Sequence, residues 1–349
     1  MTKTPSPNFA HIVRMTDRFG TFEHALFDEP RGEHGYCTDD MARLLVVATR
    51  EPQPTPSVRG LGEISLRFLS DAQGIGGAYR NRRNGRGRWV DGCTLEDCWG
   101  RSIWGLGTAS AHSDVDWLRQ SATAQFERAA RRRSPWARAM AFAAIGAAEL
   151  LSVSPDNRVA RDLLTDVADA ALAAMDASAA ISAPASDAGW RWPEARLTYA
   201  NAVVPEAMIA AGASLDRPRL LERGLELLAW LLDHETSDGH VSVVPAGGAG
   251  HGDPRPAFDQ QPIEVAALAD ACARAARVDG DERWERGVAA SVAWFLGAND
   301  GQRVMWDDNT GGGFDGLERD GVNLNQGTES TLALLSTLQH GRRLALAHH

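Results

Sequence analysis

The sequence predicts an all-α protein in which inner and outer helices form a closed ring, an (α/α)6 toroid. Six times along the chain, a loop of polar, aromatic or acidic residues runs into a helix that is apolar on nearly every side. Helices with a single apolar face alternate with these six. A helix that is apolar all round is buried, whereas a one-sided helix covers a core. We expect residues 1–349 to form a single toroid domain, with short β-hairpins in the loops on the pocket face.

The helices predicted to be inner have recognisable start signals. Thr38 and Ser134 suit the N-cap position, and Pro262 suits the first helical position. Thr94 and Asp97 have the spacing of a capping box. The six inner helices are expected to begin near Thr38, Thr94, Ser134, Asn201, Pro262 and Thr328.

Amphipathic segments between these starts predict the outer helices. They are Leu61–Leu69, Asp114–Arg133, Asn157–Met175, Arg217–Asp233 and Glu282–Leu296. The N-terminal segment, with a helix expected at His11–Arg18, is predicted to take the sixth outer place and close the ring. Trp190 and Trp192 alternate with Arg191, a pattern typical of a strand. Every long loop runs from an outer helix to the next inner one, so we expect the pocket where the inner helices begin.

Composition excludes several classes of protein. The apolar fraction of 44% is ample for a core, and no run of 18 or more apolar residues predicts a membrane span. The N-terminus lacks the apolar stretch of a signal peptide, which favours a cytoplasmic location. A net charge of -10 argues against nucleic acid as a partner.

Residue counts narrow the chemistry further. Lys3 is the only lysine, which removes Schiff-base and Walker A chemistry. Neither a disulfide framework nor a zinc site is indicated, because the cysteines are scattered without a CxxC pair. They are Cys37, Cys93, Cys98 and Cys272. We expect no cofactor and no bound metal.

Carboxylates mark the starts of four inner helices. They are Asp39 and Asp40 on the first, Glu96 and Asp97 on the second, Glu264 on the fifth and Glu329 on the sixth. Helices two and five face one another across a six-membered ring. An inverting glycoside hydrolase needs an acid and a base roughly 6.5–9.5 Å apart. The leading hypothesis pairs Glu96 or Asp97 with Glu264, and Asp40 with Glu329 is the second pair. Each carboxylate could instead cap its helix.

Further residues in the loops and first turns are candidates for binding a sugar. Aromatic faces stack on pyranose rings, and amides and carboxylates bond hydroxyl groups. Amides near helix starts also act as caps, so a structural role stays open for them. The candidates are His34, Tyr36, Asp39, Arg101, Trp136, Trp192, Glu194, Tyr199, Asn201, Asp259, Gln260, Gln261, Asn325 and Gln326.

The segment from Gly74 to Gly92 is rich in glycine and arginine and predicts an irregular hairpin. Its arginines could hold an anionic substrate or a phosphate. The alternative is a solvated loop with structural arginine–carboxylate pairs. The arginines are Arg80, Arg82, Arg83, Arg86 and Arg88.

Five motifs of the chain together resemble a known bacterial family. They are HGYCTDDMAR, LEDCWGRSIWGLG, WRWPEARLTYANAVVPEA, FDQQPIEVAA and GGGFDGLERDGVNLNQGTESTLA. They are similar to six-hairpin glycosidase-like toroids that are often associated with glycosyltransferases. The resemblance implies carbohydrate chemistry and a glycosyltransferase as a possible partner, and it names no substrate. The family tends to have Asp where this chain has Ala200.

These observations favour an inverting glycoside hydrolase that acts on a small or terminal glycoside. A phosphorylase of the same fold would use phosphate in place of water and would give the arginine-rich segment a purpose. A sugar epimerase would use histidines to move protons, and only His34 and His251 lie in suitable loops. A fourth reading is a noncatalytic protein that binds a glycan beside a glycosyltransferase.

Overall fold

The computed structural model of the protein describes residues 4–180, 189–253 and 258–347, the side chains of 177–180 excepted; Lys3 lies outside these ranges. The helices of the described chain are α1 (Ala10–Arg14), α2 (Thr38–Arg50), α3 (Pro56–Ala72), α4 (Asp97–His112), α5 (Asp116–Ala129), α6 (Ala137–Val153), α7 (Arg158–Ala180), α8 (Val203–Ser214), α9 (Pro218–His234), α10 (Pro262–Asp279), α11 (Glu282–Phe295) and α12 (Thr328–Ala347).

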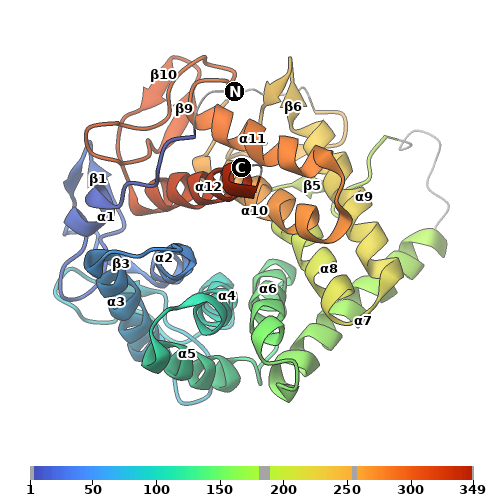
Figure 1. The fold of residues 1–349 in the computed structure, drawn as a ribbon, viewed down its shortest axis with the longest axis horizontal. Coiled ribbons are helices and arrows are strands. Elements are labelled where there is room, and N and C mark those ends of the chain that lie inside the picture. Colours follow the sequence, from blue (N-terminus) through green and yellow to red (C-terminus); the bar gives the residue numbers. More distant parts are fainter. Residues whose placement is uncertain (1–3, 181–188, 254–257, 348–349) are drawn as a thin grey trace.

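The even-numbered helices form a closed inner ring. Each contacts the next in the order α2, α4, α6, α8, α10 and α12, and α12 contacts α2 (Figure 1). The helices α3, α5, α7, α9 and α11 pack outside this ring. The short α1 contacts α12 and α3, so the N-terminal segment lies where a sixth outer helix would be. The predicted (α/α)6 toroid is confirmed.

Burial separates the two layers as the hydrophobic patterns predict. Every residue of α2 is buried, whereas α9 buries only the stripe that includes Leu220, Leu227 and Leu231. Glycines let the inner helices pack closely. A methyl carbon added at Gly107 of α4 would lie 2.0 Å from the carbonyl oxygen of Gly146 of α6. The contact between α4 and α6 therefore depends on the lack of a side chain at Gly107.

Several predicted helix starts differ from the observed ones by one or two residues. Cys37 is the N-cap of α2, and Thr38 is its first residue. Trp136, not Ser134, is the N-cap of α6, and the Ser134 hydroxyl accepts the Trp136 N–H. The capping box expected from Thr94 is absent, because Glu96 is the N-cap of α4 and its side chain makes no cap bond. The start of α10 at Pro262 is confirmed.

The long loops carry short antiparallel strand pairs; in the described chain three pairs are hairpins, as expected, whereas β3 with β4 and β5 with β8 join different loops. The strand pairs of the described chain are β1 (Ala25–Leu26) with β2 (Glu29–Pro30), β3 (Tyr36–Cys37) with β4 (Arg82–Arg83), β5 (Arg196–Leu197) with β8 (Ala249–Gly250), β6 (Thr236–Ser237) with β7 (His240–Val241), and β9 (Gly316–Glu318) with β10 (Gly321–Asn323). The strand predicted at Trp190–Trp192 is wrong, since β5 begins later, at Arg196. Among the described residues, no helix is both long and apolar enough to cross a membrane.

Candidate active site in the central cavity

A central cavity lies inside the ring, and all six inner helices line it. It encloses about 540 Å³ of space, part of which is open to solvent. The lining residues come from the first three turns of the inner helices, directly below their N-terminal ends. The cavity is therefore where the sequence places the pocket.

Arg43 joins two of the predicted carboxylates at the rim of the cavity. Its Nη1 donates to Asp40 Oδ1 at 2.6 Å, and its Nη2 lies 2.6 Å from Glu329 Oε2. The pKa of Asp40 is raised to about 7, mainly by burial. The positive charge of Arg43 lowers this pKa, and the negative charge of Glu329 adds to the increase. The Glu329 side chain is 40% exposed, whereas Asp40 is buried. Asp40 can therefore hold a proton near neutral pH, and Arg43 links it to the partly exposed Glu329.

Arg101 holds a second pair of rim carboxylates. Its Nη1 lies 3.2 Å from Asp39 Oδ1, and its Nη2 lies 3.4 Å from Asp97 Oδ2. Burial opposes ionisation of Asp39, but Arg101 and Arg43 outweigh it and lower the pKa of this carboxyl. The hydroxyl of Tyr199 bonds Asp97, and burial followed by the Asp97 charge raises the pKa of Tyr199 to about 12.

Glu264 holds the backbone that leads into α8. The N–H of Ala200 donates to its Oε1 at 2.5 Å, and the N–H of Asn201 donates to its Oε2 at 3.2 Å. Ala200 has a left-handed φ of 44°. Successive N–H groups that converge in this way make a concave anion site. Burial raises the pKa of Glu264 to about 7, although both N–H groups oppose the shift. Both oxygens of this predicted acid or base thus already have partners.

Arg138 orders the segment in front of α8. Its Nη2 donates to Glu194 at 2.9 Å, to Thr198 at 3.0 Å and to Asn201 at 3.3 Å. Its guanidinium also lies 5.6 Å from the ring centroid of Tyr199. The start of α8 therefore depends on a cation from α6 that the sequence analysis did not single out.

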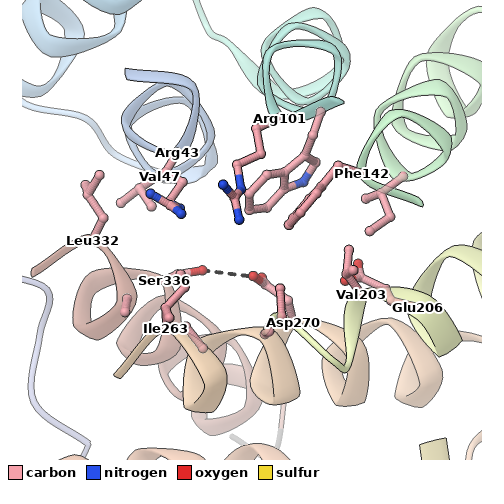
Figure 2. Close-up of a pocket in the computed structure, with 16 residues that line it drawn as sticks. Arg43, Val47, Arg101, Phe142, Val203, Glu206, Ile263, Asp270, Leu332 and Ser336 are labelled. Carbon is pink, nitrogen blue, oxygen red and sulfur yellow. Dashed lines mark hydrogen bonds between the residues drawn. The ribbon is translucent and has the colours of Figure 1, made fainter. Parts of the chain in front are cut away.

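Asp270 provides an ionised carboxylate at the floor of the cavity. Its Oδ1 accepts from Arg50 Nη1 at 2.6 Å and from Ser336 Oγ at 3.3 Å, and it lies 2.6 Å from His340 Nε2. Burial opposes its charge, but Arg50 and His340 prevail and hold the pKa of Asp270 below its usual range. Figure 2 shows Asp270 and Ser336 facing the cavity from the side opposite Arg43 and Arg101.

Glu206 is a second carboxyl group that lines the cavity. Arg274 donates from Nε to Glu206 at 2.9 Å and from Nη2 to Glu149 at 2.7 Å. Burial raises the pKa of Glu206, Arg274 opposes the shift, and the charge of Asp270 adds to it. These groups are all buried, so a network of charges closes the floor. Glu206 and Asp270 thus have pKa values shifted in opposite directions within one cavity.

One wall of the cavity is aromatic. The rings of Trp104 and Phe142 lie 5.6 Å apart between centroids, and Arg101 lies 4.7 Å from the Phe142 centroid. Trp104 Nε1 has no hydrogen-bond partner among the described residues. An aromatic face with a free polar handle suits a sugar ring, which has both apolar faces and hydroxyl groups.

Sequence reasoning missed Arg43, Glu206 and Asp270 as site residues, although all three line the cavity. The signal that could have found them is a charged residue inside a helix that is otherwise apolar. Such a group is costly to bury without a partner or a role.

Among the described residues that line the cavity, Arg101 is the only predicted site residue; most of the predicted catalytic carboxylates lie next to the lining, and several other predicted residues lie further away. Glu96 and His34 are exposed, Trp136 is 58% exposed at the start of α6, and Asp259 and Gln261 are exposed in the loop before α10. Tyr36 is fully buried against Phe22 and Phe68, so it is a core residue. Trp192 is buried beside Trp230. Gln260 accepts from Trp294, Asn325 accepts the Phe27 N–H, and Gln326 bonds Thr310, so these amides hold the loops together.

Two arginines of the segment from Gly74 to Gly92 have structural partners, as the alternative of a loop with structural arginine–carboxylate pairs predicts. Arg82 pairs with Glu23, and Arg83 lies between 5.4 and 5.5 Å from the ring centroids of Phe19, Phe68 and Trp89. These two arginines therefore stabilise the pairing of β3 with β4 beside α2.

One group of potential metal ligands lies beside α2 in the described part of the chain. Glu23, Cys37 and Asp40 bring potential ligand atoms within 4.8 Å of one another. Arg82 already pairs with Glu23, and Arg43 pairs with Asp40. The charge of this cluster is thus compensated by arginines, and the expectation that no metal binds stays a prediction.

Comparison with known proteins finds likeness in structure and not in sequence. No protein-family model and no curated protein sequence matches the chain. A sugar epimerase from a ruminal bacterium is similar at 13% identity and a TM-score of 0.66, over 96% of this chain and 95% of that one. The cellobiose 2-epimerase from Spirochaeta thermophila is similar at 12% identity and a TM-score of 0.66, over 97% and 94%.

Glycoside hydrolases are among the similar structures as well. The cellulase Cel9M of C. cellulolyticum is similar at 9% identity and a TM-score of 0.58, over 93% of this chain and 87% of that one. At such low identity these likenesses show the fold alone. The chain has the (α/α)6 toroid fold of these enzymes.

Proposed function

We propose that this protein is a carbohydrate-active enzyme, a glycoside hydrolase that removes a terminal sugar held in the central cavity. One observation carries the proposal. The cavity has an aromatic wall at Trp104 and Phe142, and Asp270 lines its floor. Asp40 is bonded to the lining residue Arg43, and the pKa values of Asp40 and Asp270 are shifted in opposite directions. Titratable groups pushed apart in this way are the usual sign of an acid and a base.

The buried charges at the floor of the cavity support one assignment of the catalytic acid and the catalytic base. A terminal sugar in the cavity directs its leaving group outward, so the acid that protonates the glycosidic oxygen belongs at the rim. The Asp40–Glu329 pair can supply that proton, because the pKa of Asp40 is about 7 and Glu329 is exposed. In an inverting reaction, water attacks from the opposite face of the sugar. Asp270 at the floor is the base that orients this water, since its bonds to Arg50, Ser336 and His340 all end on Oδ1.

Two of the remaining predicted carboxylates, Glu264 and Asp97, position other residues of the site. Glu264 positions Ala200, a cavity-lining residue, through the two backbone N–H groups. Asp97 positions Tyr199 and Arg101. A glycosyltransferase remains the predicted protein partner.

A screen of terminal glycosides tests the proposal. Wild-type protein should release a free sugar, and NMR of the first product should show inversion at the anomeric carbon. Glu329→Gln and Asp270→Asn should each lower kcat by about 10²- to 10⁴-fold, the usual contribution of an acid or base. Glu282→Gln is the matched control, because the Glu282 side chain is 85% exposed on α11.

Circular dichroism must show that each variant is folded. If folded Asp270→Asn still binds the sugar but no longer turns over the glycoside, the result supports a catalytic role for Asp270. Full turnover in both folded variants contradicts the assigned roles, and binding without turnover in the wild type identifies a glycan-binding protein instead.

A sugar epimerase or isomerase is the second candidate. The likeness to the ruminal epimerase and to a D-mannose isomerase, at TM-scores of 0.66 and 0.67, covers 95% of each of those chains. Within the described part of the chain, however, the cavity lining contains no histidine. Incubation of free aldoses in D₂O distinguishes the candidates, because an epimerase incorporates deuterium at the carbon next to the carbonyl group and a hydrolase does not.

A further inference from the structure

The central cavity is polarised from one side to the other. Arg43 of α2 and Arg101 of α4 point into it from one side, and Asp270 of α10 and Glu206 of α8 face them from the other (Figure 2). The walls between these groups are mostly apolar. Charges in such a water-poor cavity act on a ligand more strongly than charges at a surface. A ligand is therefore oriented by its own charge and by its hydrogen-bond donors.

Arg101 is the group best placed to meet a ligand. It is buried, and its guanidinium lies 4.7 Å from the centroid of the Phe142 ring, which fixes its plane. Asp39 and Asp97 each approach a single Nη atom, at 3.2 and 3.4 Å, and Nε has no partner among the described residues. A guanidinium has five N–H donors. The two carboxylates therefore neutralise Arg101 without using all of its donors.

Among the described residues that line the cavity, the buried polar atoms without a hydrogen-bond partner are both donors. They are Arg101 Nε and Trp104 Nε1. A neutral sugar hydroxyl both donates and accepts, but a carboxylate or phosphate only accepts and suits the planar fork of arginine.

We propose that the sugar bound in this cavity carries an anionic group, the carboxylate of a uronic acid or a phosphate monoester, held by Arg101 with Arg43 beside it. This inference rests on the proposed function, since it names the class of sugar at the same site. The anionic group faces α2 and α4, and the hydroxyl groups on the other edge of the ring donate to Asp270 and Glu206.

Calorimetry on the wild-type protein tests this without any mutation. The ligands are glucuronate, galacturonate, glucose 6-phosphate, glucuronamide and glucose. Because a hydrogen bond to a charged group contributes more than a neutral one, an acidic sugar should bind about 10- to 100-fold more tightly than its neutral counterpart. Preference for the uronates or for the phosphate identifies which anion is used. Equal or tighter binding of glucuronamide and glucose overturns the proposal.

Variants then locate the anion. Arg101→Gln should abolish the preference for the acidic sugar over its amide, and Arg101→Lys should keep only part of it because the fork is lost. Arg286→Gln, on the outer face of α11, is the matched control and should keep the full preference. An undiminished preference in folded Arg101→Gln and Arg101→Lys also overturns the proposal. The comparison of acid and amide on wild-type protein stands even if Arg101→Gln fails to fold.

The two proposals fail in different ways. Binding of the acidic sugars without turnover of any glycoside leaves the anionic site intact and contradicts the hydrolase. Turnover of neutral glycosides with no binding of acidic sugars leaves the hydrolase intact and contradicts the anionic site.

Discussion

At the scale of the residue, burial and neighbours decide the protonation state of each carboxyl group. Asp40 and Asp270 are both buried aspartates on inner helices. Burial dominates at Asp40 and raises its pKa to about 7. At Asp270, Arg50 and His340 overcome burial and lower the pKa. The same residue type thus becomes a proton donor at the rim and a carboxylate at the floor.

The raised pKa of Asp40 predicts a dependence of stability on pH. A carboxyl group whose pKa is about 7 in the fold and 3.8 in the unfolded chain binds its proton more tightly when folded. Its contribution to stability is therefore fully present below about pH 4 and is lost as the pH rises through 7. Asparagine cannot ionise. The free energy of unfolding of Asp40→Asn, minus that of the wild type, should increase between pH 5 and pH 8.

Urea unfolding at pH 5, 6, 7 and 8 measures this difference. Asp320→Asn, exposed in the turn between β9 and β10, should show no such increase. A difference for Asp40→Asn that is constant with pH would show that Asp40 is ionised throughout the range.

At the scale of the element, close contacts between inner helices set how each one is rotated toward the cavity. Gly100 and Gly107 of α4 lie against the backbone of α6 at Ala139 and Gly146. This contact fixes the rotation of α4, and a neighbouring side of the helix, with Arg101 and Trp104, faces the cavity. Small residues on one face of a helix therefore place functional residues on another.

Gly107→Ala tests this contact. The new methyl group would lie 2.0 Å from the Gly146 oxygen, so the two helices must separate. Overpacking of this kind costs about 1–3 kcal/mol, and we expect the free energy of unfolding to fall by at least that amount. The control is Gly60→Ala on α3, where no atom lies within 4 Å of the added carbon. It should be neutral or stabilising by up to about 1 kcal/mol. Equal effects of both changes in urea unfolding would contradict the account.

At the scale of the whole molecule, the ring closes where the last inner helix, α12, meets the first, α2. Gln339 of α12 donates to the carbonyl oxygen of Val47 at 2.9 Å and to Glu51 at 3.1 Å. Arg343 donates to the carbonyl oxygen of Arg50 at 2.7 Å. These bonds join residues almost 300 positions apart, so they form only when the other helices are in place.

Gln339→Leu should weaken this closure. The change removes the donor to Val47 and Glu51 and leaves buried acceptors without it, which costs about 1–3 kcal/mol. The loss should appear as a lower midpoint of urea unfolding with an unchanged slope. Gln120→Leu, at an exposed position on α5, should leave the midpoint nearly unchanged. An unchanged midpoint for Gln339→Leu would mean that these bonds do not hold the ring together.

The layers of the fold could be predicted because the information for them is local. Whether a helix is apolar all round or on one face is written in consecutive residues, as α2 and α9 show. The acidic first turns of α2, α4, α10 and α12 could be predicted for the same reason. The exact helix starts could not, because Cys37 and Trp136 take N-cap positions that side-chain preference assigns to Thr38 and Ser134.

The sequence by itself determined that the protein is a ring of helices with acidic starts on one face. Only the tertiary structure decided which charged side chains share the cavity. Arg50 and Asp270 are 220 residues apart, and their contact depends on the rotation of α2 and α10 about their own axes and on the closure of the ring. Neither rotation nor closure is encoded in a local pattern, because each results from the packing of all six inner helices at once.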